Sequence, residues 1–304
     1  MLSSLLHNNY YWLLDPDSQL ISPNFSTHIT EEHWFLQQDN TTLFNYLSQH
    51  PAYFKQALQS QKNHRLGYYY ERLWWAWLQH NPRYQVLAHN IPLRDAQRTL
   101  GELDFIVLDR KRQHIEHWEV AVKFYLGVGD TQHLSSWHVI GLRDRLDRKL
   151  HRMCDHQLPL LFTSAGQAYC QQQQWQITQQ RLILQGRLFY PLAISNNNNP
   201  KIPVEINPTH HTGFWASRAQ VLEHCLVDKF SWVLLSKEQW LAPITSSTAT
   251  GGTWEQLIRQ LNQAGQRECC VAQLENGKEV QRGFILPDEW EQQALAINSC
   301  NELM

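Results

Sequence analysis

The clearest pattern in the sequence is a set of apolar residues at helical spacing between residues 65 and 80. Leucine, tyrosine and tryptophan recur there at intervals of three and four positions, as on the buried face of a helix. Asn81 and Pro82 follow this segment, and a proline at that place prevents the helix from continuing. The pattern therefore predicts a helix over residues 65–80.

Apolar segments typical of strands follow the predicted helix. We expect strands over residues 84–91, 103–108 and 115–122, because each is rich in apolar and β-branched residues. Residues 109–113 are polar and charged, which predicts a hairpin turn between the second and third strands.

Helical spacing returns over residues 142–157, and the short apolar segment 158–162 then predicts one more strand. The predicted order is therefore helix, three strands, helix, strand, within an α/β fold built on a mixed sheet. Two low-complexity runs follow, glutamine over residues 171–174 and asparagine over residues 196–199. The asparagine run, followed by Pro200, is the best candidate for a domain boundary.

The rest of the chain is expected to form two further parts. Residues 1–62 have the pattern of a helical and irregular N-terminal region, with one helix beginning near Asp39. Beyond the asparagine run we expect helices near residues 218–230 and 253–264, and a hairpin that turns at Asn276-Gly277. The predicted division is a region over 1–62, an α/β core over 63–195 and a smaller α/β domain over 196–304.

The predicted hairpin brings two acidic residues together. If its turn centres between Lys111 and Arg112, Asp104 lies directly opposite Glu119, with Cβ atoms about 4.5–5.5 Å apart. Two such carboxylates repel each other unless a proton or a cation lies between them. Magnesium prefers oxygen ligands of this kind and keeps several of its waters, so the pair is a candidate metal site.

Lys123 lies on the same predicted strand face as Glu119 and could stabilise a charged transition state. The simpler interpretation is a charge pair on an exposed sheet face, which two acids and a lysine alone would favour. However, Glu119 is flanked by apolar residues such as Trp118 and Val120, and acids embedded in apolar strands need a structural or chemical reason.

These segments together resemble a known superfamily. A helix with Glu71, then Gly101-Glu102-Leu103-Asp104 on one strand and Glu119-Val-Ala-Val-Lys123 on the next, is similar to the PD-(D/E)XK nucleases. The segments TLGELDF, HWEVAVKFYLG, DRLDRKL and HQLPL more closely resemble an uncharacterised bacterial family, domain of unknown function number 1853, which is placed in that superfamily. The resemblance implies a restriction-endonuclease-like core within residues 63–195 and metal-dependent nuclease activity with Mg²⁺ or Mn²⁺.

The resemblance also implies roles for individual residues. Asp104 matches the metal-binding aspartate, Lys123 the catalytic lysine and Glu71 the acid found on the first helix of many members. One position departs from the pattern, because the second acid normally lies two residues before the lysine and Ala121 stands there. Glu119 lies four residues before Lys123, about 13 Å away in a regular strand. A bulge could shorten that distance, or Glu102, which faces Ala121 in the predicted register, could supply the missing carboxylate.

Two other groups of residues have competing interpretations. Arg145, Lys149 and Arg152 share one face of the predicted helix 142–157 and could contact nucleic-acid phosphates, but aspartates interleave with them, which is typical of a solvated helix with ion pairs. A zinc site among His114, Glu116, His117 and Glu119 is disfavoured, because strand alternation places these side chains on both faces.

Composition narrows the class of protein. The 304 residues are 42% hydrophobic and 18% charged, as in folded soluble proteins, and the net charge of −2 argues against binding DNA through bulk positive charge. Six cysteines without a Cys-x-x-Cys pair favour reduced thiols. No basic leader and no long apolar run are present, so we expect no signal peptide, no membrane span and a cytoplasmic location.

Three functions remain open from the sequence. The leading one is a metal-dependent phosphodiester hydrolase that acts on DNA or RNA. Ala121 favours the second, a catalytically degenerate module that retains the nuclease fold and binds nucleic acid or protein. The third is a small-molecule hydrolase that uses the same metal site. The sequence does not distinguish DNA from RNA or define an oligomeric state.

Overall fold

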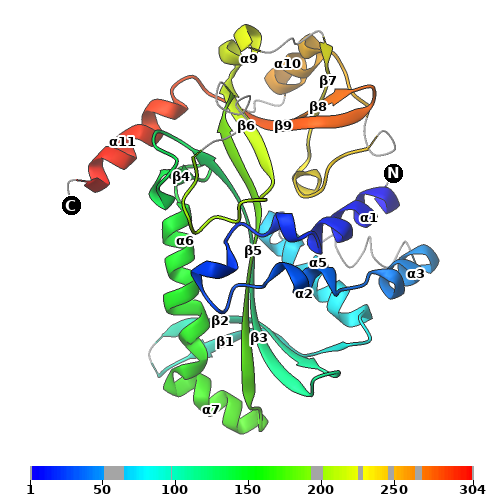
Figure 1. The fold of residues 1–304 in the computed structure, drawn as a ribbon, viewed down its shortest axis with the longest axis vertical. Helices are drawn as coiled ribbons and strands as arrows, with labels where there is room; N and C mark the ends of the chain where they lie inside the picture. The colour runs from blue at the N-terminus through cyan, green and yellow to red at the C-terminus, as the bar shows by residue number, and fades with distance from the viewer. Residues whose placement is uncertain are drawn as a thin grey trace. The chain divides into compact units, whose positions relative to one another are not determined.

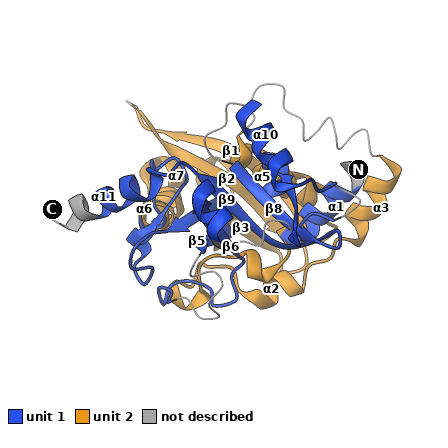
Figure 2. Cartoon of the chain, turned by 90° about the horizontal axis from the view of Figure 1, so that it is seen from above, with its two compact units in different colours: residues 1–12, 123–147, 186–304 blue, residues 13–122, 148–185 orange. Residues whose placement is uncertain are grey.

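The computed structural model describes residues 2–50, 65–96, 98–192, 201–224, 229–245, 250–263 and 269–302. The fold is α/β with a large mixed sheet (Figure 1). Contacts divide the chain into two compact units, which Figure 2 colours separately. Unit 1 comprises residues 1–12, 123–147 and 186–304, and unit 2 comprises residues 13–122 and 148–185. The predicted boundary at residues 196–199 lies outside the described residues, and the predicted division into three parts stays a prediction.

Unit 2 is built on the strands β1 (Tyr84–Arg94) and β2 (Thr99–Asp109) and on the first parts of β3 (His114–Gly127) and β5 (Ile177–Pro191), in the order β1-β2-β3-β5. Its helical elements are α2 (Glu32–Leu36), α3 (Thr41–Gln49), α5 (Leu66–His80), most of α6 (Leu146–Arg152) and α7 (Ser164–Gln173), with short turns η1 (Pro16–Ser18), η2 (Pro23–Phe25), η4 (Met153–Gln157) and η5 (Leu158–Phe162).

Unit 1 continues β3 and β5 and adds the strands β4 (Trp137–His138), β6 (Thr212–Ser217), β7 (Ser231–Leu234), β8 (Cys269–Glu275) and β9 (Lys278–Leu286), with β5, β6, β9, β8 and β7 adjacent in that order. Its helical elements are α1 (Leu2–Leu13), α9 (Arg218–His224), α10 (Trp254–Gln263) and α11 (Trp290–Glu302), with short turns η3 (Leu134–Ser136) and η7 (Lys237–Trp240). A core cluster that includes Phe214, Trp232 and Trp254 packs α9 and α10 against the strands.

Most predicted elements are confirmed. The helix over residues 65–80 is α5, and the three strands and the polar turn are β1, β2, β3 and the connection between the last two. The C-terminal hairpin is also confirmed, because Asn276 and Gly277 both have positive φ, at 52° and 74°, as a tight hairpin turn requires.

Two predicted elements differ from the structure. Residues 158–162 do not form a strand but the 3₁₀ turn η5, in which Pro159 occupies the first turn and the leucines are buried. The helix predicted over residues 142–157 begins only at Leu146, because Leu142 adopts a left-handed conformation with φ 55°. Its last turn, η4, is a π-helix. The strand that follows is β5, which the sequence pattern did not predict.

The helices of the described residues include none that is long and apolar enough to cross a membrane. Cys154 and Cys170, which were expected to be reduced, carry free thiols.

Candidate functional site

The β2–β3 hairpin has the register that the sequence predicts. Asp109 pairs with His114 and Phe105 pairs with Trp118, so the turn centres between Lys111 and Arg112. The next residues along the two strands are Asp104 and Glu119. These two acids therefore face each other in unit 2.

The carboxyl groups of Asp104 and Glu119 lie close enough to hydrogen-bond to one another. Glu119 is fully buried and Asp104 is partly buried, where its Oδ2 also accepts the Val120 N–H at 2.9 Å. Burial, and for Asp104 the negative charge of Glu119, raise the pKa of both groups well above the usual carboxyl range. The pair therefore holds a proton at neutral pH unless a cation binds there.

Glu71 is the third acid of this group. It lies on α5 and is partly buried, and burial raises its pKa to about 7, with Asp104 and Glu102 adding repulsion. Glu102 is exposed. The structure thus brings Glu71, Asp104 and Glu119 together, which we call the acid cluster, and leaves Glu102 at its edge.

Lys149 supplies positive charge to the acid cluster. Its charge lowers the pKa of Glu71, Asp104 and Glu119 alike, so its ammonium group lies near all three. Lys149 Nζ also donates to Gln157 Oε1 at 3.2 Å, and Gln157 Nε2 donates to Glu119 Oε2 at 2.6 Å. Gln157 is the last residue of the π-helical turn, a feature that is frequent at functional sites.

The other oxygen of Glu119 contacts a buried histidine. His117 Nε2 lies 2.8 Å from Glu119 Oε1, and Gln180 Nε2 donates to His117 Nδ1 at 3.1 Å and to the Leu158 carbonyl at 2.7 Å. Burial lowers the pKa of His117 to about 4, so its ring is neutral. Because Gln180 donates to Nδ1, the ring proton lies on Nε2 and points to Glu119.

Three of the predicted site residues are not part of the acid cluster. Lys123 belongs to unit 1 and forms an ion pair with Asp144, with Nζ 2.8 Å from Oδ2. Arg145 precedes α6, and its buried guanidinium binds both carboxylate oxygens of Asp147, at 3.0 and 2.7 Å. Arg152 is exposed on α6.

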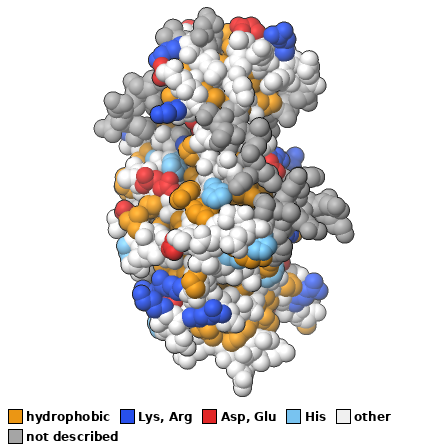
Figure 3. Space-filling model, turned by 90° about the vertical axis from the view of Figure 1, so that its right-hand side faces the viewer, with side chains coloured by type: hydrophobic (Ala, Val, Ile, Leu, Met, Phe, Trp, Pro, Cys, Tyr) orange, Lys and Arg blue, Asp and Glu red, His pale blue; other side chains and the backbone are white. Residues whose placement is uncertain are grey.

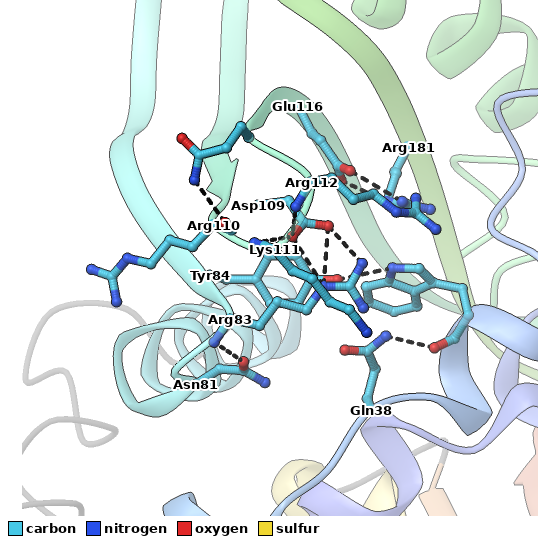
Figure 4. A network of polar contacts seen from close by, with 12 residues as sticks. Gln38, Asn81, Arg83, Tyr84, Asp109, Arg110, Lys111, Arg112, Glu116 and Arg181 are labelled. Carbon is cyan, nitrogen blue, oxygen red and sulfur yellow. Dashed lines mark hydrogen bonds and ion pairs between the residues drawn. The ribbon is translucent and has the colours of Figure 1, made fainter.

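A second polar network lies at the tip of the same hairpin (Figure 4). The guanidinium of Arg83 donates to both oxygens of the buried Asp109, whose Oδ1 also accepts the N–H groups of Lys111 and Arg112. This arrangement fixes the turn.

Beside that turn lies a buried ion pair between Glu116 and Arg181, with 2.7 Å between Oε2 and Nε. Trp118 Nε1 donates to Glu116 Oε2 at 2.8 Å, and the Arg181 guanidinium lies 5.1 Å from the ring centre of Trp34.

Tyr70, Trp74 and Trp77 of α5 are buried as well, so the aromatic residues of that helix serve mainly as core.

The acid cluster fits a hard divalent cation in its donor chemistry. Among the described residues no group of three or more His, Cys, Asp or Glu side chains has a metal-binding arrangement. Magnesium needs only one or two carboxylates, because waters and substrate oxygens complete its shell. Asp104 and Glu119 offer such a pair, although both oxygens of Glu119 already accept hydrogen bonds.

Sequence reasoning did not find the roles of His117, Gln157 and Gln180. His117 could have been found, because it lies two residues before Glu119 on the same strand face. Gln157 and Gln180 gave no such signal, since their contacts depend on the π-helical turn and on the unpredicted strand β5.

Comparison with known proteins gives a family but no activity. Searches of curated proteins and of solved structures found no match. The family model described as Domain of unknown function (DUF1853) matches residues 9–286, which is most of the chain. The chain therefore belongs to this family.

Proposed function

We propose that the protein is a metal-dependent phosphodiester hydrolase with a restriction-endonuclease-like core, acting on DNA or RNA. The observation that carries the proposal is the pairing of Asp104 with Glu119 on adjacent strands, with Glu71 and Lys149 beside them. Acids gathered at one point of a sheet beside a lysine suit phosphoryl chemistry, in which developing negative charge needs stabilisation.

The order of elements around the acid cluster supports the same proposal. Helix α5, strands β1 to β3 and helix α6 follow one another as in the superfamily that the sequence resembles. The predicted fourth strand at residues 158–162 is absent, and β5 stands beside β3 in its place. We therefore assign β5 to the nuclease-like core.

Each residue of the acid cluster has a proposed role. Asp104 and Glu119 would hold Mg²⁺ or Mn²⁺, which supplies charge neutralisation and a more acidic bound water. Glu71, with its pKa of about 7, is suited to accept a proton from the attacking water near neutral pH. Lys149 would bind a phosphate oxygen, the role that the sequence resemblance gives to Lys123. Gln157 and His117 hold Glu119 in place through both of its oxygens.

A specific observation favours the second candidate, a binding module that has lost catalysis. His117 and Gln157 already satisfy the two oxygens of Glu119. Lys123 forms an ion pair with Asp144, and Ala121 occupies the usual place of the second acid. An acid pair held in this way could remain stable without metal.

Cleavage assays decide between the two candidates. Wild-type protein would be incubated with labelled single- and double-stranded DNA and RNA in Mg²⁺, Mn²⁺ or EDTA, beside Asp104→Asn, Lys149→Met and Lys123→Met. We expect metal-dependent cleavage by the wild type that Asp104→Asn and Lys149→Met lose. Asp95→Asn, at an exposed turn, is the matched control and should cleave normally. If wild-type protein that binds nucleic acid cleaves none of these substrates, the binding module is correct.

A further inference from the structure

A groove of about 640 Å³ lies in unit 2 between η5, α7 and the start of β5. Phe162, Trp175 and Ile177 provide its apolar surface. The Phe162 side chain is 67% exposed, which is unusual for phenylalanine, whereas Trp175 is partly buried and fixed by an edge contact with Tyr169. The volume lies within the usual range of ligand sites.

The rim of this groove is rich in amide groups. Gln167 and Gln171 lie one helical turn apart on α7, and Gln176, Gln179 and Gln180 follow on the other side. Gln167, Gln171 and Gln176 are exposed, and each offers both donors and an acceptor, as the edges of nucleic-acid bases do. An aromatic floor with an amide rim suits a flat, polar-edged ring such as a base.

A smaller cavity of about 180 Å³ continues the groove, since Thr27, His28, Gln179 and Gln180 line both. Two guanidinium groups, those of Arg112 and Arg181, line this cavity. Because Arg181 is neutralised by its ion pair with Glu116, Arg112 is the cation that this cavity offers to an anion.

The acids around the smaller cavity are largely engaged by other groups. Arg181 pairs with Glu116, and His33 lies 2.8 Å from Glu31, the acid that lines the cavity. Asp109 is bound by Arg83, so it does not compensate Arg112 (Figure 4).

The hairpin tip beside this cavity is positively charged. Arg110, Lys111 and Arg112 are consecutive and exposed. Within the described residues none of the three forms an ion pair. Figure 3 shows Lys and Arg side chains gathered next to hydrophobic ones in the lower part of the face it draws. Charge complementarity therefore points to a polyanion with flat rings.

We propose that this groove and the cavity beside it bind a short segment of single-stranded nucleic acid. One base stacks against Phe162 in the groove, and a neighbouring phosphate contacts Arg112 in the smaller cavity. An uncharged peptide would leave the cationic tip without a partner. The proposal does not depend on catalysis, because the groove would bind a strand whether or not the acid cluster cleaves it.

Gln180 connects the groove to the acid cluster. It lines the groove, and its Nε2 donates to His117, which contacts Glu119. A strand bound in the groove would therefore lie against the same residue that orients His117. Under the proposed function, this connection would place the bound strand beside the acid cluster.

Fluorescence anisotropy with a labelled oligodeoxythymidine of about 12 nucleotides tests the proposal. The full-length protein is titrated in EDTA, so that cleavage cannot interfere. We expect Phe162→Ala to weaken binding by about 5- to 100-fold through lost stacking. Arg112→Gln should lower the slope of log affinity against log salt by about 0.7, the value for one phosphate contact on a single strand.

Two variants serve as matched controls. Tyr11→Ala removes another exposed aromatic side chain, 63% exposed in unit 1, and Arg98→Gln removes a cation whose side chain is 79% exposed at a different hairpin. Both should bind as tightly as the wild type. Equal weakening by these controls would overturn the assignment, as would no binding by the wild type at about 100 µM protein in low salt.

Crosslinking locates the strand without any substitution. An oligonucleotide that contains 4-thiothymidine should crosslink to peptides that carry Phe162 or Trp175, as mapped by mass spectrometry. Crosslinks confined to other segments would overturn the proposal. So would displacement of the oligonucleotide by an acidic peptide of equal charge at equal concentration, because the groove would then recognise an acidic peptide.

Discussion

Gln157 donates a 2.6 Å hydrogen bond to Glu119, which lies 38 residues earlier in the chain. This bond joins the π-helical turn after α6 to the centre of the sheet in unit 2. It also joins Lys149 to the acid cluster, because the same amide accepts from Lys149 Nζ. The cation of the proposed site thus reaches the acids from a helix, not from the strand that carries Glu119.

The first prediction concerns Asp104→Asn. Without divalent metal this substitution should raise the thermal midpoint by roughly 2–4 °C, the shift expected from about 1 kcal/mol. The reason is that folding forces the buried pair to take up a proton at neutral pH, a cost that asparagine removes while it keeps an oxygen for the Val120 N–H. Differential scanning fluorimetry in EDTA measures the shift. In Mg²⁺ the wild type should gain stability and the variant should not; equal gains in both would exclude Asp104 as a metal ligand.

The sequence predicted the hairpin of the acid cluster because its register follows from local rules. Asp109 closes the turn through the N–H groups of Lys111 and Arg112, and pairing continues without a shift to Phe105 and Trp118. With the turn placed, strand alternation alone sets Asp104 opposite Glu119.

The rest of the site could not be predicted in this way. A π-helical turn changes the angular spacing of side chains, so helical periodicity does not show where Gln157 points. Strand β5 carries the polar residues Gln179, Gln180 and Arg181 in a segment where the sequence predicted no strand. Gln180 and Arg181 are nevertheless buried, through contacts with His117 and Glu116. Contacts made between distant segments, not local pattern, decide these positions.

The second prediction concerns pH and the Arg83–Asp109 ion pair. Burial alone would raise the pKa of Asp109, but the hydrogen bonds from Arg83 and from the turn N–H groups outweigh it and lower the pKa. Because the pKa of Asp109 is lower in the folded state, the ion pair stabilises the fold at pH values above the pKa of an unfolded aspartate, about 4. This stability is lost as the pH falls through the pKa of Asp109 in the folded state. Asp109→Asn should therefore cost about 3 kcal/mol at neutral pH.

Urea unfolding at neutral pH and in the acid range below about pH 4 tests this prediction. The difference between wild type and Asp109→Asn should shrink at acid pH, because the wild-type carboxylate also becomes neutral there. Asp95→Asn is the control, since Asp95 and Arg98 are largely exposed and 3.8 Å apart, and it should change stability by less than about 0.5 kcal/mol. A difference that stays constant with pH would contradict the assignment.

The third prediction compares two helical glycines. A Cβ on Gly166 of α7 would lie 2.3 Å from the Leu160 carbonyl oxygen, so Gly166→Ala should displace η5 and cost about 1–3 kcal/mol. A Cβ on Gly67 of α5 meets nothing within 4 Å, so Gly67→Ala should stabilise by about 0.5–1 kcal/mol. Urea unfolding of the two variants shows whether each substitution lowers or raises the free energy of unfolding. Stabilisation by Gly166→Ala would show that η5 does not pack closely on α7.

The fourth prediction concerns the buried pair of Glu116 and Arg181. Removing one partner leaves a buried charge without its counterion, so Glu116→Gln and Arg181→Met should each cost about 3 kcal/mol. The double variant buries neither of these two charges. Its loss in free energy of unfolding should be smaller than the sum of the two single losses by at least about 1 kcal/mol.

Urea unfolding of all four proteins, followed by tryptophan fluorescence, gives the coupling energy of this pair. Trp118 retains an acceptor in Glu116→Gln, because a glutamine oxygen can replace the carboxylate oxygen that its indole N–H contacts. The coupling therefore reports the ion pair and not the indole bond. Additive costs would mean that Arg181 is stabilised mainly by its contact with the ring of Trp34, in which case Trp34→Leu should destabilise the wild type and Glu116→Gln by equal amounts.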